Sequence, residues 1–505
     1  MKGLGVGAGT FTLGQTYAEA GKNLPKYKYP EPKKLDDLIS DEGYICLRVA
    51  FSNSNEDKRS LSANGNITVN GAKIVKQKTY FFEGMDDTLR VPELDYDLEV
   101  ENNNVDVVVL WLDDFSLNTE IVISKPSLSG TLSDILKKKE LKHQANGLHI
   151  TVNPLLYHEI ATINPADYGI MASGSQFSFL AFADPQGGDP LDKEKLDTRM
   201  KIHNAFVEES VWMANHLDID PAFTIVIGDI TDGQGYAEDF LQMNKFLKKL
   251  KTPLLYSIGN HETRYRLNFS PGYNMEGFKN YFAAQKEANG MELLLYSFDL
   301  GEWHFIVWPD PLRDGFWENH PHYFEWLERD LEKNKDKPVM FFQHVPAHPV
   351  GINPLINYAE SVVVKKTLLD VLAEHGNVEY ILSGHVHIPI KSSFKTAVTY
   401  KGMKMINLPA AGYRPRAFGE EDFHCGPSQG FAIVDIDGKK AKITFKNVTE
   451  EEYTYPEKLP EFNESLYNLW LNYKWEIPAS ANIVNGSFED GFKGHVTKLN
   501  TNKYI

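Results

Sequence analysis

Short apolar runs alternate with longer helical patterns through the middle of the chain. Two of these runs, Phe223–Ile227 and Leu254–Ile258, are mostly apolar and each ends abruptly at a glycine. Runs of this length and composition are typical of buried parallel strands. The stretch between them, from Tyr236 to Leu250, has a helical pattern, so this part of the chain predicts one strand–helix–strand unit.

The same alternation continues on both sides of this unit. Further strands are predicted at Phe177–Phe182, Lys337–Phe342 and Val378–Leu382, an antiparallel pair at Leu294–Leu300 and Glu302–Trp308, and helices at Lys193–Leu217, His322–Lys335 and Ser361–His375. Strands that alternate with helices in this way predict an α/β fold, a four-layer α/β/β/α domain from about residue 172 to residue 435.

The flanking regions follow a different pattern. Residues 43–171 contain short alternating or β-branched runs separated by turns such as Asn64-Gly65 and Asn70-Gly71, which predicts an N-terminal β-sandwich. This region has no cluster of candidate ligands, so we interpret it as a structural domain, with contact to a glycan or a surface as the alternative. A hairpin at Phe431–Phe445 either completes the sheet of the preceding domain or joins a C-terminal β-rich extension, residues 436–505.

Composition and charge restrict the class of protein. Of the 505 residues, 42% are hydrophobic, which is enough for sizeable cores, and no stretch reaches the ~20 consecutive apolar residues of a membrane helix. The formal net charge of −17 argues against a nucleic-acid duplex or an anionic membrane as the main partner. Cys46 and Cys425 are far apart in the sequence, so a disulfide framework is not expected.

The N-terminus has features of an export signal. Gly3–Gly14 is rich in glycine and mildly apolar, and Ala18-Glu19-Ala20 has the small-x-small form of a cleavage site. Residues 1–9 resemble the tail of a twin-arginine signal, although no arginine pair precedes them, so we expect residues 1–20 to be a truncated export signal, followed by an extended lead-in at residues 21–42. This predicts a periplasmic or secreted protein. The alternative is a glycine-rich N-terminus with no targeting role, which leaves a cytoplasmic location open.

Candidate ligands occur where the predicted strands end. In chain order they are Asp184 and Gln186, Asp229 and Asp232, Asn260, His261 and Glu262, His344, and finally His385 and His387. Ligands of open α/β sheets bind at the carboxyl ends of the strands, so we expect these side chains to converge.

The ordered motifs resemble a known family. Asp184-x-Gln186, Gly228-Asp229-x-x-Asp232, Gly259-Asn260-His261-Glu262, His344 and Gly384-His385-x-His387 resemble the five-motif signature of the calcineurin-like metallophosphoesterases. The usual first motif of that family is Asp-x-His, and Gln186 is similar to the variant of a subgroup whose motif reads Asp-Pro-Gln. The N-terminal β-domain also resembles a domain of some exported bacterial members.

The resemblance implies two divalent or mixed-valence metal ions, Mn, Fe or Zn. Asp229 would bridge them, with Asp184, Gln186 and His387 completing the first site and Asn260, His344 and His385 completing the second. Mixed carboxylate, imidazole and amide ligation without thiolate suits such ions. Glutamine in place of histidine exchanges a nitrogen donor for an amide oxygen, so we expect a weaker first site or a preference for harder ions.

The resemblance also implies roles for neighbouring residues. His261 would lie beside the metals and act as a general acid while a metal-bridging hydroxide attacks in line. Asp232 and Glu262 are predicted to orient the ligand histidines. Arg264, Arg414 and Arg416 are candidates for contact with substrate phosphate, and solvated pairing with the acidic surface is the alternative for each of them.

The predicted function is therefore two-metal hydrolysis of phosphate esters of a small-molecule substrate, with phosphomonoesters preferred and phosphodiesters next. The alternatives are a nucleotide pyrophosphatase or a cyclic-nucleotide phosphodiesterase and, from another class, a non-catalytic binding scaffold. A scaffold is expected to have lost ligands, whereas every inferred ligand position here holds a competent donor.

Overall fold

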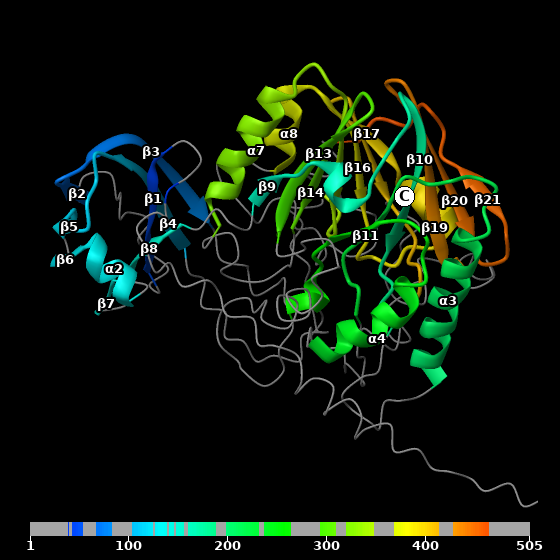
Figure 1. The fold of residues 1–505 in the computed structure, drawn as a ribbon, viewed down its shortest axis with the longest axis horizontal. Helices are drawn as coiled ribbons and strands as arrows, with labels where there is room; N and C mark the ends of the chain where they lie inside the picture. The colour runs from blue at the N-terminus through cyan, green and yellow to red at the C-terminus, as the bar shows by residue number, and fades with distance from the viewer. Residues whose placement is uncertain are drawn as a thin grey trace, which may run out of the picture.

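The computed structural model describes fourteen parts of the chain. These are residues 39, 43–53, 67–82, 104–124, 127–138, 141–145, 148–155, 160–187, 198–231, 237–263, 293–309, 320–347, 368–413 and 428–463. Within them, an N-terminal pair of sheets lies at one end of the molecule and a larger α/β region makes up the rest (Figure 1).

The N-terminal region has two sheets, as the alternating pattern predicts. The five-stranded sheet has the order β3-β4-β1-β8-β7 and the three-stranded sheet the order β2-β5-β6. Their elements are β1 (Ile45–Asn53), β2 (Ile67–Asn70), β3 (Lys73–Phe82), β4 (Asn104–Asp113), β5 (Glu120–Ser124), β6 (Ser127–Thr131), α2 (Leu132–Lys138), β7 (Leu141–Ala145) and β8 (Leu148–Pro154). Residues of both sheets share one buried core, which defines a sandwich.

Strand β1 is buried on both faces. Leu47 and Val49 point into the core of the sandwich, whereas Cys46 and Ala50 belong to the larger core of the molecule. The second face of the five-stranded sheet therefore packs against the α/β region. The contact is reinforced at β3, where Lys78 forms ion pairs of 3.1 Å with Glu325 and 2.7 Å with Glu328 of α7 (His322–Lys333).

The α/β region contains two mixed sheets. The six-stranded sheet has the order β12-β11-β10-β19-β20-β21, and the seven-stranded sheet has the order β17-β18-β16-β15-β14-β13-β9. The six-stranded sheet consists of β10 (Gln176–Ala183), β11 (Thr224–Ile227), β12 (Leu254–Ser257), β19 (Gly430–Asp437), β20 (Lys440–Asn447) and β21 (Glu452–Thr454). The seven-stranded sheet consists of β9 (Ile160–Thr162), β13 (Leu295–Leu300), β14 (Trp303–Trp308), β15 (Val339–Gln343), β16 (Val378–Ser383), β17 (Val398–Tyr400) and β18 (Met403–Asn407).

The two sheets pack face to face through aromatic side chains. The Phe179 ring of β10 meets the Phe305 ring of β14 at a centroid distance of 5.6 Å and the Phe342 ring of β15 at 6.0 Å, both edge to face. Such pairs add to the stabilisation that burial of the rings provides. This aromatic layer holds the ends of the two sheets in a fixed relation, and those ends carry the candidate ligands.

Helices cover the outer faces, which confirms the predicted four-layer α/β/β/α arrangement. Helices α3 (Thr198–Ala214) and α4 (Ala237–Leu247) lie on the side of the six-stranded sheet, and α7 and α8 (Leu368–His375) on the side of the seven-stranded sheet (Figure 1). The remaining short elements are η4 (Pro165–Tyr168), η6 (Asn260–Thr263) and α9 (Ile390–Thr396). Within the described helices, none combines the length and apolar composition needed to cross a membrane.

Both edges of the α/β region differ from the sequence-based boundaries. Strand β9 pairs in parallel with β13, so the seven-stranded sheet takes in chain that precedes residue 172. At the other edge, β19 pairs with β10 and β20 pairs with β19, so the C-terminal hairpin completes the six-stranded sheet, one of the two alternatives. In both cases the long-range partner strand, not the local pattern, decides to which sheet the segment belongs.

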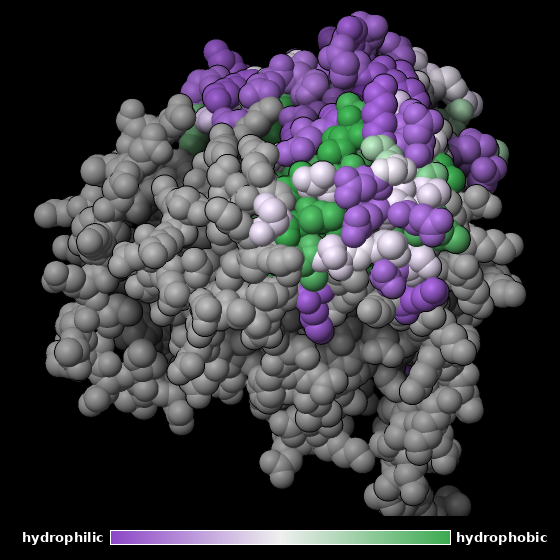
Figure 2. Space-filling view, turned by 90° about the vertical axis from the view of Figure 1, so that its left-hand side faces the viewer, coloured by the Kyte–Doolittle hydropathy of each residue, from purple (hydrophilic) through white to green (hydrophobic). Residues whose placement is uncertain are grey.

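The described surface on the N-terminal side is mainly hydrophilic. Figure 2 views the molecule from that side and shows hydrophilic residues over much of the described surface, with a smaller apolar area between them. Exposed apolar side chains of the N-terminal region include Ile74, Val75 and Leu117. Single exposed apolar residues are common on folded proteins.

Candidate metal centre

Five strand ends deliver the predicted ligands to one place between the sheets. Asp184 and Gln186 follow β10, Asp229 follows β11, Asn260 and His261 follow β12, His344 follows β15, and His385 and His387 follow β16. All eight side chains are buried. The structure thus brings together every predicted ligand and the predicted general acid.

The backbone is left-handed at five of these residues, although none is glycine. The φ angles are 44° at Asp184, 37° at Gln186, 47° at Asp229, 71° at His385 and 52° at His387. Side-chain-bearing residues rarely adopt this conformation, and each instance costs about 1–3 kcal/mol. Strain of this kind concentrates at functional sites, because the surrounding packing holds the residues there.

Neighbouring glycines allow the loops to approach one another. A Cβ atom at Gly259 would overlap the backbone and carboxylate of Asp229, and one at Gly384 would overlap the Asp184 carboxylate. The motif glycines are therefore required sterically, because any side chain would push the candidate ligands apart.

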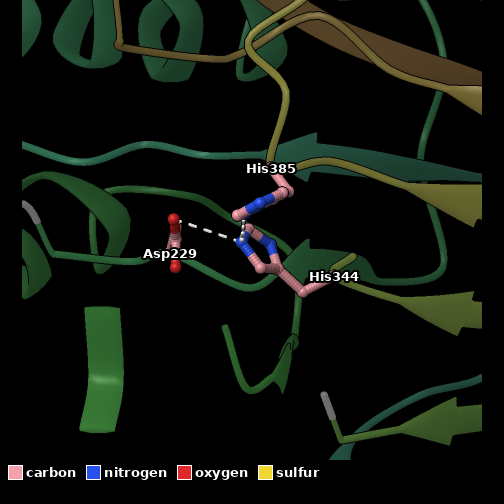
Figure 3. Close-up of side chains that lie close together, drawn as sticks. All are labelled: Asp229, His344 and His385. Carbon is pink, nitrogen blue, oxygen red and sulfur yellow. Dashed lines mark hydrogen bonds and ion pairs between the residues drawn. The ribbon is translucent and has the colours of Figure 1, made fainter. Parts of the chain in front are cut away.

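One group of candidate ligands surrounds His344. The His344 Nε2 atom lies 3.1 Å from Asp229 Oδ2 and 3.3 Å from His385 Nδ1 (Figure 3). The same atom lies 3.2 Å from Asn260 Oδ1. The other ring nitrogen, Nδ1, lies 3.0 Å from the carbonyl oxygen of Ile227. If Nδ1 donates to that carbonyl, Nε2 is left to face the cluster as a ligand atom.

A second group shares Asp229. His387 Nε2 lies 3.2 Å from Asp184 Oδ1, and Gln186 Nε2 donates to Asp229 Oδ2 at 2.9 Å. The ligand atoms of Asp184, Asp229 and His387 lie within 4.8 Å of one another, as do those of Asp229, His344 and His385. Asp229 is the residue common to both groups.

The charges of the site are strongly coupled. Burial alone would raise the pKa of Asp229, but the imidazoles of His344, His261 and His385 outweigh it and hold that pKa well below its usual range. Burial likewise disfavours a charged His344, yet the carboxylates of Asp229 and Asp184 raise the pKa of His344 to about 10. In the metal-free protein, a proton on His344 therefore compensates buried negative charge.

The residues fit divalent metal ions. Two buried carboxylates, three imidazoles and two amides converge, a donor set that suits Mn, Fe or Zn. Gln186 Oε1 is buried and, within the described residues, has no hydrogen-bond partner. A cation between the two groups would supply the positive charge that the protonated His344 supplies in its absence, and it would give Gln186 Oε1 a partner.

His261 lies at the edge of this cluster. Its Nε2 atom is 3.7 Å from Asp229 Oδ2, and its backbone N–H donates to Asp229 Oδ1 at 2.9 Å. Its side chain belongs to neither group of three candidate ligands. This position is compatible with the predicted place beside the metals.

Glu262 has other partners than the sequence suggested. Its carboxylate was predicted to orient ligand histidines, but it accepts backbone N–H groups from Gly259 at 2.7 Å, Asp229 at 2.9 Å and Ile230 at 2.8 Å. It therefore fixes the loop after β11 to the loop after β12. Burial and the Asp229 carboxylate raise the pKa of Glu262 to about 7, against the opposing effect of His344 and the backbone donors.

Several predicted residues lie outside the described part of the chain. They are Asp232, the three candidate substrate arginines Arg264, Arg414 and Arg416, the export signal at residues 1–20, most of the lead-in at residues 21–42, Cys425, and residues 464–505 of the predicted extension. Their roles stay predictions.

Two aromatic residues at the site were not predicted. The Tyr413 ring lies against the His387 ring at a centroid distance of 4.0 Å and against the His203 ring at 4.6 Å. His203 belongs to α3, and its Nδ1 lies 3.3 Å from the backbone oxygen of Gln186. The sequence offers no signal for either residue, because His203 is a lone histidine within a helical pattern and Tyr413 only precedes the candidate arginine Arg414.

The site and the two-sheet fold together define a metallophosphoesterase type of domain. Residues 177–389 match the sequence profile of the calcineurin-like phosphoesterases.

Individual proteins are similar to parts of the chain. A probable glycerophosphodiester phosphodiesterase, GpdQ of Arcobacter nitrofigilis, is 26% identical over 198 residues, which are 38% of this chain and 64% of that protein. The chain thus spans less than two thirds of the length of this relative.

Two solved structures show weak similarity. Purple acid phosphatase PPD1 from yellow lupin seeds is 14% identical, and the match covers 84% of this chain and 71% of that chain with a TM-score of 0.39. GAP50, the anchor in the inner membrane complex of Plasmodium, is 14% identical, and the match covers 61% of this chain and 98% of that chain with a TM-score of 0.38.

Proposed function

We propose that this protein hydrolyses phosphate esters with two divalent metal ions bound between its two sheets. The observation that carries the proposal is the pair of buried ligand groups that share Asp229. A shared carboxylate is what a two-metal site requires, since the two ions must lie close together to act on one phosphoryl group. The match of residues 177–389 to the profile of the calcineurin-like phosphoesterases supports the same conclusion.

The protein residues have separate tasks in this proposal. Asp184, Gln186 and His387 would hold one ion, Asn260, His344 and His385 the other, and Asp229 both. When bound, the ions neutralise charge on the phosphoryl oxygens and activate the attacking water. The Ile227 carbonyl fixes the His344 ring at its Nδ1 atom, which keeps Nε2 directed at the ligand cluster.

His261 would donate a proton to the oxygen of the leaving group. Its backbone N–H donates a hydrogen bond to Asp229 Oδ1, which holds the residue beside the shared carboxylate. Its ring belongs to neither ligand group and is therefore available for proton transfer. Removing a general acid of this kind typically slows a reaction about 10²–10⁴-fold. His261→Ala should therefore lower kcat by that factor without changing the number of bound metal ions.

The preferred substrates would be phosphomonoesters of small molecules, as the sequence predicts. Phosphodiesters are the second candidate, and the similarity to a probable glycerophosphodiester phosphodiesterase favours them. The two classes differ in the number of substituents on the phosphate, so paired chromogenic substrates with one leaving group distinguish them.

The test measures turnover of p-nitrophenyl phosphate and bis-p-nitrophenyl phosphate by protein reconstituted with Mn²⁺ or Zn²⁺. Asp229→Asn and His261→Ala should each abolish most of the turnover. The matched control is His216→Ala, which removes a histidine on the outer side of the chain turn after α3, where its ring stacks on Trp212. Equal losses in His261→Ala and His216→Ala would contradict the assignment of His261.

Two negative results would lead to the alternatives. Two bound metal ions without turnover of either substrate would favour a nucleotide pyrophosphatase or a cyclic-nucleotide phosphodiesterase with a more demanding substrate. Absence of both metal binding and turnover would favour a non-catalytic scaffold.

A further inference from the structure

The two ligand groups depend on different numbers of imidazoles. The group around His344 contains two, His344 and His385, whereas the group with Asp184 contains only His387. Gln186, which donates to Asp229 Oδ2 at 2.9 Å, offers this group an amide and no further imidazole. The metal affinity of the Asp184–Asp229–His387 group should therefore be especially sensitive to the orientation of the His387 ring.

The His387 ring is packed against an aromatic side chain. The Tyr413 ring lies 4.0 Å from it between centroids, at an interplanar angle of 37°. By comparison, the orientation of His344 is set by the carbonyl oxygen of Ile227 at 3.0 Å. The two histidines are thus held by different kinds of neighbour, one by a ring face and the other by a backbone acceptor.

Tyr413 is itself firmly placed. It is 4% exposed, its backbone N–H donates to the carbonyl oxygen of Asp184 at 3.4 Å, and its own carbonyl oxygen accepts from Gln429 Nε2 at 3.3 Å. The preceding Gly412 lies so close to the carbonyl oxygen of Pro185 that a Cβ atom there would overlap it. The segment that carries Tyr413 is therefore docked directly on the loop that carries Asp184 and Gln186.

His203 supports the same arrangement from α3. Its side chain is fully buried, its ring meets the Tyr413 ring at 4.6 Å, and its Nδ1 lies 3.3 Å from the backbone oxygen of Gln186. One helix residue thus contacts both the tyrosine and the loop of the glutamine. A displacement of the Tyr413 ring would free space on one side of the His387 ring.

We propose that Tyr413 is a positioning residue that orients His387 for metal binding, with His203 supporting it. This inference rests on the proposed function, since it requires the Asp184–Asp229–His387 group to bind an ion. Hydrogen-bonded residues that orient a metal-binding histidine typically contribute about 10–100-fold to metal affinity, and we expect a ring contact with the same task to fall in this range. Loss of the Tyr413 ring should therefore weaken one of the two metal equivalents by that factor and leave the other nearly unchanged.

The experiment is a calorimetric titration of metal-free protein with Mn²⁺ at pH 8, with both equivalents resolved. Tyr413→Leu removes the ring, and Tyr413→Phe keeps it. The matched control is Tyr380→Leu, which removes a buried tyrosine of β16 that packs near Trp303. We expect one equivalent to be weakened about 10–100-fold in Tyr413→Leu, and both to stay near their wild-type affinity in Tyr413→Phe and Tyr380→Leu.

Three results would overturn the inference. They are unchanged affinities in Tyr413→Leu, equal weakening of both equivalents, and a similar selective loss in Tyr380→Leu. If Tyr413→Leu does not fold, Tyr413→Met is judged by the same criteria, because its flexible side chain fills irregular space without a ring. If the wild-type protein binds only one metal equivalent, the proposed function is overturned as well. If the wild-type protein binds two equivalents and Tyr413→Leu changes the affinity of neither, only the role of Tyr413 is overturned.

Discussion

Glu262 joins the two loops that carry Asp229 and Asn260, and it does so without belonging to either candidate ligand group. Its Oε2 atom accepts N–H groups from Gly259 and Asp229, and its Oε1 atom accepts those of Ile230 and Thr231. Glu262→Gln keeps the size and shape of the side chain but turns one of the two oxygens into an NH₂ group. Two of the four backbone donors then face a donor instead of an acceptor.

The expected cost follows from these two lost acceptors. A buried donor that loses its acceptor costs about 1–3 kcal/mol, so two of them cost about 2–6 kcal/mol. Domains of ordinary stability have about 5–15 kcal/mol in total, so this loss is a large share of it. We expect it to appear first as local opening of the loop at Asp229–Thr231, because at least one of the lost hydrogen bonds lies there whichever oxygen is replaced.

The assay is urea unfolding together with hydrogen–deuterium exchange of the peptide that contains residues 229–231, both on metal-free protein at pH 8. At that pH Glu262 is mainly a carboxylate, since its pKa is raised to about 7. The control is Glu208→Gln, which breaks an exposed ion pair of 2.6 Å with Lys249 and should cost at most about 1 kcal/mol. Unchanged exchange at residues 229–231 in Glu262→Gln, or a loss no larger than that of Glu208→Gln, would refute the reasoning.

Three further changes test other parts of the structure. Gln186→His replaces an amide, which donates to Asp229 Oδ2 at 2.9 Å, by an imidazole. The preference for Zn²⁺ over Mn²⁺ in a competition titration should therefore rise. An unchanged preference would contradict the expectation that Gln186 weakens metal binding at its site or favours harder ions. Gly384→Ala places a Cβ atom into the Asp184 carboxylate and 3.0 Å from the Ala183 Cβ, so it should cost about 1–3 kcal/mol by thermal unfolding and reduce metal binding; normal binding would show that the loop can move aside. His304 lies 2.8 Å from both Asp299 and Asp330. Burial lowers the pKa of His304, but the two carboxylates outweigh burial and raise that pKa above 6.5. Burial raises the pKa of Asp299, but its contacts with His304 and Lys337 outweigh burial and hold that pKa at about 2. The stabilisation from His304 is thus complete below pH 6.5 and is lost as the pH rises through its raised pKa, whereas that from Asp299 is present above pH 3.8 and is lost as the pH falls towards 2. The stability difference between wild type and His304→Asn, measured by urea unfolding across pH, should accordingly be largest between about pH 4 and 6.5, and a flat difference would contradict this.

The sequence by itself determined the layered α/β architecture and the proximity of the candidate ligands that follow neighbouring strands of one sheet. Short apolar runs with β-branched residues, such as Phe223–Ile227, are typical of buried strands, and polar residues follow this one directly after a glycine. Because parallel strands in one sheet share an edge, residues after different strands must meet there. Asp184, Asp229 and Asn260 follow parallel strands of one sheet and could therefore be placed together before any tertiary contact was known, whereas His344 follows a strand of the other sheet.

Only the tertiary structure decided how those ligands are held. Two of the backbone partners of Glu262, Asp229 and Ile230, lie on a loop about thirty residues earlier, and the Tyr413 ring contacts His387 although no local sequence pattern relates the two residues. The left-handed backbone at Asp184 and His385 is likewise imposed by surrounding packing, since these residue types seldom adopt it on their own. Contacts between distant segments depend on the relative placement of two whole sheets, which no short stretch of sequence contains.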